Sequence, residues 1–245
     1  MSIATLRAMP ADKPVKLQVR RKRVLLLAVA FFLLSALWFG YSLLRTPSWY
    51  RPPVVPVENQ QKVRNNLVAA EQAFTQSLLA GSTFRYHIYQ DDINKWLAMR
   101  KEIYPRVDEL APSTLRDPFV LIKPGKITLA GLIENSTLSG VVSLDFDISY
   151  ADDAIQVVAS AFRCGSIRLP MKLDRLQLDR PIKMYENDAW PGSPPIEGSL
   201  MSGLRIERDG WWKNGGVDYR VVDLVALDGQ IDLVIEPRGR HSRNK

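Results

Sequence analysis

The stretch from Val24 to Leu44 constrains this chain more than any other, because its twenty-one residues include no charged side chain. As a helix rising about 1.5 Å per residue it is roughly 31 Å long, close to the thickness of the hydrocarbon layer of a bilayer. A helix of this length in a soluble core normally keeps a polar stripe, which this stretch lacks. The sequence therefore predicts a membrane-spanning helix.

The charges on either side of this helix predict its orientation. Residues 20–23 are all basic, whereas Arg45 stands alone at the other end. Basic clusters stay on the cytoplasmic side, so we expect a single-pass protein of the bacterial cytoplasmic membrane with its amino terminus inside and its carboxyl-terminal domain outside. Trp49 and Tyr50 suit the outer membrane interface. The alternative is a cleaved signal peptide, whose apolar region is usually shorter; we expect an uncleaved signal anchor.

The net charge of +7 is concentrated at the two ends of the chain. Residues 1–23 carry a net +6 and residues 238–245 a net +4, which leaves −3 for the stretch between them. A folded surface that binds nucleic acid needs a basic patch, so no nucleic-acid partner is expected.

The inventory of reactive side chains is small. Cys164 is the only cysteine, and His87 and His241 are the only histidines. An intramolecular disulfide is therefore excluded, and zinc binding or histidine-dependent catalysis is not expected. We expect no metal site and no cofactor.

Composition divides the chain into five segments. We expect a basic cytoplasmic tail at 1–23, the membrane helix at 24–44, a proline-rich spacer at 45–57, an extracytoplasmic domain at 58–237 and a disordered basic tail at 238–245. The four prolines within ten residues of the spacer favour an extended chain.

The first part of the domain has helical periodicity. Apolar residues spaced by three and four predict a helix over 58–80, followed by Gly81 as its carboxyl-terminal cap. After a short strand over 84–88, Asp91 is expected to cap a second helix with Trp96 as its core anchor. The apolar face of the first helix, Val63 to Leu78, is expected to cover the sheet.

Beyond Pro105 the apolar period changes to two, which is typical of strands. The clearest pair is 142–150 and 155–161, joined by a tight turn at 152–153. Further strands are expected at 126–132, 200–207, 217–224 and 230–236, with a loop at 188–195. The order predicts an α+β fold: an amino-terminal transmembrane helix, then a domain with two helices packed on a curved, mostly antiparallel sheet.

The segment Gln90-Asp91-Asp92-Ile93-Asn94-Lys95-Trp96-Leu97 follows a single membrane helix and a first helix. Together with the paired strands and the turn Gly165-Ser166-Ile167-Arg168-Leu169-Pro170, it resembles the YpmS-like family of membrane-anchored bacterial proteins of unassigned function. The resemblance covers about residues 24–175. It implies a curved sheet wrapped on a long helix, similar to tubular lipid-binding modules, and it supplies no catalytic residue.

No catalytic constellation is evident in the sequence. Asp145 and Asp147 alternate with serines along one strand, a pattern typical of a solvated strand face, and Asp91 with Asp92 is explained by helix capping. Motifs for serine hydrolases, zinc proteases and phosphate loops do not occur. A hydrolase that uses only serine and lysine is not excluded, but no such pair is singled out.

The apolar strand face is the main candidate for a ligand site. Six of its residues are expected to line a groove for a lipid or another hydrophobic ligand: Leu144, Phe146, Ile148, Ile155, Val157 and Ala159. Three functions remain open: a non-enzymatic lipid-binding envelope protein, a structural or assembly partner of other envelope proteins, and an unrecognised hydrolase. An open interior favours the first, and a dense core favours the second.

Trp211 and Trp212 are candidates for an interaction surface. Two adjacent aromatic residues on a strand point to opposite faces, so we expect one of them to be exposed unless a bulge turns it inward.

Overall fold

The computed structural model describes residues 15–103, 115–134, 139–151, 153–169, 182–184, 196–199 and 203–240. The chain divides into two compact units, residues 1–42 and 43–245. Helix α1 (Val15–Leu44) includes the stretch Leu25–Leu44, whose mean hydropathy of 2.0 and length of 20 residues are sufficient to cross a membrane. The amino-terminal apolar helix is therefore confirmed, and it begins before the basic cluster at 20–23.

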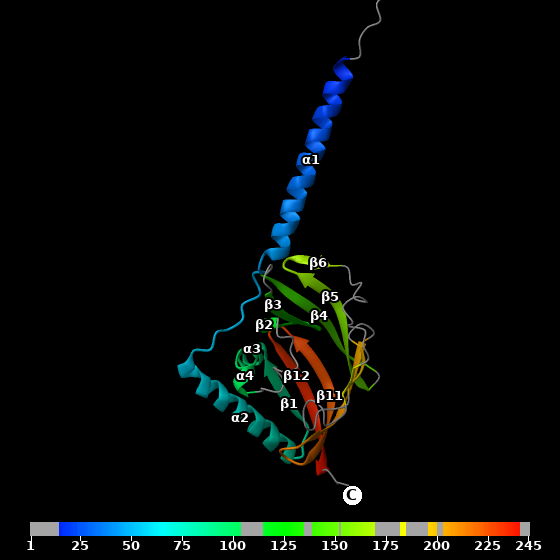
Figure 1. Ribbon diagram of the computed structural model, residues 1–245. Helices are drawn as coiled ribbons and strands as arrows, with labels where there is room; N and C mark the ends of the chain where they lie inside the picture. The colour runs from blue at the N-terminus through cyan, green and yellow to red at the C-terminus, as the bar shows by residue number, and fades with distance from the viewer. Residues whose placement is uncertain are drawn as a thin grey trace, which may run out of the picture. The chain divides into compact units, whose positions relative to one another are not determined.

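The described part of the second unit contains three further helices and two antiparallel sheets, so the expected α+β arrangement is confirmed (Figure 1). The helices are α2 (Val57–Leu79), α3 (Gln90–Ala98) and α4 (Arg100–Ile103). Sheet A has the order β1-β12-β11-β10, formed by Phe84–Tyr89, Gln230–Arg240, Val217–Leu227 and Asp209–Trp212.

Sheet B is the larger of the two sheets. Its path runs β2-β3-β4-β5-β9-β8-β7, and β6 also pairs with β5. The strands are β2 (Leu115–Lys123), β3 (Lys126–Glu134), β4 (Ser139–Ala151), β5 (Ala154–Cys164), β6 (Ile167–Leu169), β7 (Ile182–Met184), β8 (Ile196–Ser199) and β9 (Gly203–Glu207). A single sheet was expected, whereas the structure has two.

Helix α2 packs on sheet A. Phe74 lies 4.9 Å from both Tyr86 of β1 and Trp212 of β10, measured between ring centroids. Phe74 and Leu78 are buried together with Val217 and Ile235 of the same sheet. In Figure 1, α2 and α3 lie on one side of β1 and β12. The expectation that this helix covers the apolar face of β4 is therefore wrong, because its apolar residues are used by the other sheet.

Helix α3 covers the outer edge of β2. The amide side chain of Asn94 accepts a hydrogen bond from the Val120 N–H (2.7 Å) and donates one to the Val120 C=O (2.9 Å). One turn earlier, the Gln90 Oε1 accepts a bond from the Ile122 N–H at 2.7 Å. Because an unpaired edge strand exposes its backbone to other chains, these two amides protect β2 by imitating a neighbouring strand.

Two expectations for this helix are wrong. The buried side chain of α3 is Asn94, whereas Trp96 is only partly buried and lines a small cavity. The residue at the amino-terminal cap is Tyr89, and Asp91 lies in the first turn, where its charge still favours the helix dipole. The carboxyl-terminal end of α2 follows the prediction, since Gly81 has a φ of 73° and its N–H bonds to the Leu78 C=O.

Part of the segment that was expected to be a spacer, residues 45–57, packs against the domain. Tyr50 is 9% exposed and packs with Trp49 against Phe119 of β2. The Tyr50 hydroxyl donates a 2.7 Å bond to the Asp117 C=O. The second unit therefore includes Trp49 and Tyr50, and their position at a membrane interface stays a prediction.

The remaining differences concern the carboxyl-terminal part. Strand β12 continues to Arg240, so the first three residues of the expected tail, 238–240, belong to sheet A. Strands β2, β6, β7, β8 and β10 were not predicted, and the predicted loop at 188–195 and the tail after 240 lie outside the described residues.

Candidate functional site

The pairing register of sheet B defines an apolar face. Residues directly opposite one another in antiparallel strands point to the same side of the sheet. One row joins Leu129 of β3, Leu144 of β4, Phe162 of β5 and Leu169 of β6. The next pairs on this side are Phe146 with Ala159, Ile148 with Val157, Tyr150 with Ile155, and then Leu204 and Ile206 of β9. We call this set of residues the apolar face.

The six groove candidates all lie on the apolar face, and most of them are incompletely buried. Leu144, Phe146, Ile148 and Val157 are partly exposed, as is Phe162, whereas Ile155 and Ala159 are buried. Leu129, at the β3 end of the first row, is 40% exposed. A bulge between Asp145 and Phe146 in the pairing of β4 with β5 places Ala161 opposite Asp145, so Ala161 lies on the other side of the sheet.

The opposite side of the same strands carries polar residues that are more deeply buried. Thr128, Ser143 and Asp145 are 6%, 3% and 2% exposed. The expectation that Ser143 and Asp145 belong to a solvated face is therefore wrong, although Asp147 and Ser149 are exposed as expected. Sheet B thus buries several polar side chains and leaves part of its apolar side open.

The buried carboxylate of Asp145 is held by two neighbours. The Thr128 hydroxyl donates to Oδ1 at 2.8 Å, and the Arg163 guanidinium donates to Oδ2 at 2.9 Å. Both oxygens of Asp145 therefore have partners that compensate for its removal from water. The ion pair positions β3, β4 and β5 against one another.

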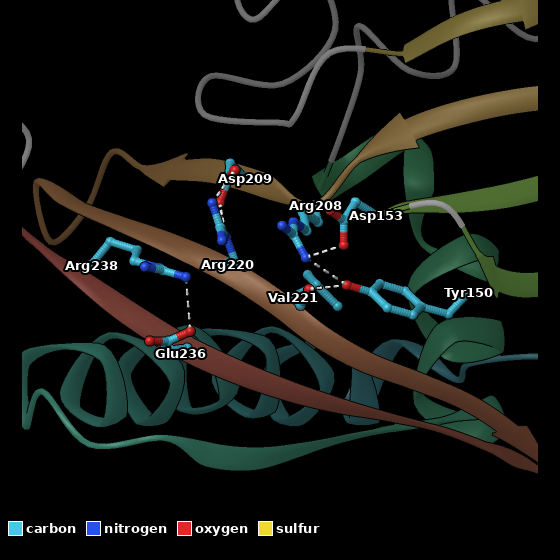
Figure 2. A network of polar contacts seen from close by, with 8 residues as sticks. All are labelled: Tyr150, Asp153, Arg208, Asp209, Arg220, Val221, Glu236 and Arg238. Atoms are coloured by element: carbon cyan, nitrogen blue, oxygen red, sulfur yellow. Dashed lines mark hydrogen bonds and ion pairs between the residues drawn. The ribbon is translucent and has the colours of Figure 1, made fainter.

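A second polar network lies where the two sheets are joined. Strands β9 and β10 are separated by Arg208 alone, so one chain segment passes directly from sheet B to sheet A. Figure 2 shows that the side chain of Arg208 points toward Tyr150 and Asp153 at the end of the β4–β5 hairpin. Arg208 donates to the Asp153 carboxylate at 2.5 Å and to the Tyr150 hydroxyl oxygen at 3.5 Å.

The Tyr150 hydroxyl and an arginine pair complete this network. Tyr150 donates to the Val221 C=O of β11 at 3.3 Å, so it bridges the two sheets. On sheet A, Arg220 donates two bonds to the carboxylate of Asp209, at 2.6 and 2.8 Å. Arg238 pairs with Glu236 at 3.0 Å on the same side of the strands (Figure 2).

The charges of this network balance, which argues against an anion site. Its three arginines each have one carboxylate partner: Arg208 with Asp153, Arg220 with Asp209, and Arg238 with Glu236. A phosphate would have to displace these partners, and the pairs would lose two charge-assisted bonds at Asp209. We interpret the network as a set of polar contacts that hold the two sheets together.

This arrangement predicts an acid-sensitive contact. The hydrogen bonds from Arg220 lower the pKa of Asp209. A carboxyl group whose pKa is lower in the folded state stabilises the fold above its unfolded pKa of about 3.9, and this stabilisation is lost as the pH falls through the folded pKa. We expect the Asp209→Asn variant to show a shallower loss of stability below about pH 4 than the unchanged chain. Urea unfolding from pH 6 to 3 checks this, and parallel curves would contradict it.

The two tryptophans of β10 are both partly buried. Trp212 donates from its indole nitrogen to the Thr75 hydroxyl at 2.8 Å and packs on α2, so it is part of the domain core. The expectation that one of the pair is exposed is therefore wrong. A role for Trp211 in partner binding stays a prediction.

Among the described residues no group of three or more histidine, cysteine or acidic side chains is placed to hold a metal ion. Cys164 is partly buried, and this burial raises the pKa of its thiol, so the thiolate is disfavoured.

No family model, curated protein or solved structure matches this chain. The resemblance to the YpmS-like family thus stays a prediction from the quoted motifs.

Proposed function

We propose that this chain is a non-enzymatic, membrane-anchored envelope protein whose outer domain binds the hydrocarbon chain of a lipid along the apolar face. The observation that carries the proposal is the uneven burial of sheet B. Its polar residues Ser143 and Asp145 are almost completely buried, while Leu129 is 40% exposed and Leu144 and Phe162 beside it are partly exposed.

The packing of α2 supports this proposal. An antiparallel sheet with one apolar side needs a cover for that side. The amphipathic helix that the sequence offers for this purpose packs on sheet A through Phe74 and Leu78. Sheet A covers part of the apolar side of sheet B, where Ile127 packs with Ala226 of β11 and Tyr150 bonds to Val221. A hydrocarbon chain would cover the exposed part around Leu129, and each methylene group that it buries contributes about 0.8 kcal/mol.

The arrangement of the apolar face suits an extended chain better than a compact ligand. The row from Leu129 to Leu169 crosses four strands, and neighbouring strands lie about 4.8 Å apart. This gives a strip of roughly 14 Å, the length of about eleven extended methylene groups. A medium-length acyl chain therefore fits the strip.

The test uses the full chain in nanodiscs and a fatty acid with a photoreactive diazirine in its acyl chain. We expect cross-links in peptides from 127–163, and we expect Leu129→Gln to reduce them several-fold. Leu79→Gln is the matched control, because Leu79 is 56% exposed on α2 and lies outside the apolar face. Cross-links confined to α1, or an equal yield in both variants, would refute lipid binding at this face.

We propose further that the amino terminus is cytoplasmic and the second unit lies outside, as the basic cluster at 20–23 suggests. Alkaline phosphatase fused after Lys245 should then be active, whereas a fused cytoplasmic reporter should be silent. The reverse result would invert the topology and place the apolar face in the cytoplasm.

A further inference from the structure

Strand β1 forms one end of sheet A. In the part of the chain that the structure describes, it pairs with β12 alone. The bond from the Gln90 N–H to the Gly229 C=O shows which opposite residues of β1 and β12 form hydrogen-bonded pairs. Since hydrogen-bonded pairs alternate, Phe84, Tyr86 and Ile88 exchange bonds with β12. The backbone N–H and C=O groups of Arg85 and His87 and the N–H of Tyr89 therefore point to the open side of the sheet, while the Tyr89 C=O lies at the amino-terminal cap of α3.

A small slot runs along this open edge. It is lined by four consecutive residues of β1, Tyr86 to Tyr89, and by pairs one helical turn apart on two helices: Asn66 and Ala70 of α2, Asp92 and Trp96 of α3. Its volume is about 110 Å³, which is smaller than the 300 Å³ or more of an ordinary small-molecule site. The slot suits a single aliphatic side chain, and the β1 backbone beside it offers hydrogen-bonding groups.

We propose that this edge binds an extended peptide segment of a partner protein, which adds to sheet A as a fifth strand beside β1. The peptide backbone bonds to the outward groups of Arg85, His87 and Tyr89, and one aliphatic side chain enters the slot between α2 and α3. Main-chain bonds supply affinity, and the slot supplies selectivity.

The contrast with β2 supports this assignment. The edge of sheet B has its outward backbone groups capped by Asn94 and Gln90 of α3. No described side chain does the same for β1, since Asn66 and Asp92 line the slot without a hydrogen bond to that strand. Of these two edges, the chain thus protects β2 and leaves β1 accessible.

A second copy of this chain fits the edge poorly. Pairing of β1 with its own copy requires a two-fold axis perpendicular to sheet A, which keeps both copies of α2 on the same side of the joined sheet. Each copy of α2 reaches the edge, because Asn66 and Ala70 line the slot and the Tyr86 hydroxyl reaches the Ala70 C=O at 3.5 Å. The second helix would therefore compete for the slot, whereas a bare peptide strand brings no helix with it.

The charges around the slot indicate a peptide that is neutral or basic. Asp92 lines the slot, and His87 is paired with Asp232 at 2.8 Å. Burial raises the pKa of Tyr86, and the carboxylates of Glu71 and Asp92 raise it further, which places both acidic groups near this residue. Basic groups are also close, since Lys95 pairs with Asp92 at 3.7 Å and the exposed Arg85 lies on β1. A peptide that is neutral or carries a single basic residue therefore suits the edge better than an acidic one.

The test uses the full chain in nanodiscs and a fluorescent seven-residue peptide with the sequence of β12 from Gln230 to Glu236, with lysine at the two acidic positions. Two N-methylated forms carry three methyl groups each, at peptide positions 2, 4 and 6 or at positions 3, 5 and 7. Strand addition uses alternate N–H groups, so we expect one form to bind at least tenfold more weakly and the other to bind like the parent.

Protein variants identify the edge. His87→Pro removes one outward N–H and leaves the β12 ladder of Tyr86 and Ile88 intact, so it should weaken peptide binding at least tenfold. His87→Ala retains the N–H and also lacks the contact with Asp232, so the difference in peptide affinity between the two variants measures the contribution of the His87 N–H. Near-ultraviolet circular dichroism checks that both variants are folded.

Three outcomes would overturn the proposal. The first is absence of binding at millimolar peptide, and the second is equal weakening by both methylation patterns. The third is a dimer in sedimentation that His87→Pro dissociates, because the occupant would then be a second copy of the chain. Loss of lipid cross-linking at the apolar face would leave this proposal unaffected, since the two sites lie on different sheets.

Discussion

Replacing Asn94 by leucine should lower the free energy of unfolding by about 3 to 5 kcal/mol, because two buried backbone groups lose their partners. The Asn94 amide satisfies both the N–H and the C=O of Val120, and it is itself only 3% exposed. Leucine has a similar volume but neither a donor nor an acceptor. The measurement is urea unfolding of the full chain in detergent micelles, followed by near-ultraviolet circular dichroism.

Three further variants show whether the loss comes from the hydrogen bonds. Gln90→Leu removes one bond, to the Ile122 N–H, and should cost about 1 to 2 kcal/mol. Asn94→Asp retains the acceptor for the Val120 N–H and loses the donor to the Val120 C=O. Its free energy of unfolding should therefore also be lower than that of the unchanged chain. Lys95→Leu is the control on the exposed side of the same helix and should change stability by less than about 0.5 kcal/mol. Equal effects of Asn94→Leu and Lys95→Leu would contradict the proposed edge protection.

Replacing Arg163 by leucine should destabilise the domain by about 3 kcal/mol, because it leaves the Asp145 carboxylate buried without its counter-charge. Asp145 is 2% exposed, and among the described residues its carboxylate receives one hydrogen bond apart from that of Arg163, from Thr128. Thermal unfolding of the full chain measures the effect.

The double variant distinguishes the ion pair from simple packing. Asp145→Leu combined with Arg163→Leu removes both charges, so it should recover most of the stability lost in Arg163→Leu. A double variant that loses the sum of the two single effects would show that the side chains act independently. Arg168→Leu is the surface control, since Arg168 is exposed and bonds only to the Ser160 C=O within the described residues.

The sequence predicts where the strands of this domain lie better than it predicts what packs against each side of them. Apolar and polar residues alternate along β4 and β5, and this local pattern shows which side of each strand is apolar. The sequence does not show how completely each side is covered. Ser143 and Asp145 alternate with apolar residues like any solvated face, and only the distant Arg163 and Thr128 explain why Asp145 is buried.

For the same reason, the periodicity of α2 does not show on which sheet the helix packs. Spacing identifies Phe74 and Leu78 as one apolar face but does not name the sheet that receives it. The choice depends on aromatic residues that follow much later, such as Trp212 and Tyr219. A signal for the slot at β1 was also weak, because Trp96 and Asn66 have ordinary helical spacing and come from two separate helices.

The motif that suggested a family resemblance has a physical explanation in the structure. Gln90 and Asn94 are four residues apart, so both amides lie on one side of α3 and reach the same strand edge. Ile93 and Leu97, the apolar members of the motif, pack with Val120 and Ile122. The sequence shows the spacing, but the strand that these residues serve, β2, was not predicted.

The pairing of β1 with β12 has a consequence for the order in which the chain folds. His87 and Asp232, which face each other on these strands, are separated by 145 positions in the sequence. Contacts between such distant segments slow folding, because a long loop must close before any hydrogen bond forms. Until Gln230 and the residues after it are available, β1 has no neighbouring strand, and α2 lacks Ile235 in the surface on which it packs. A chain shortened by the length of β12 should therefore lose the first strand of the domain together with the last.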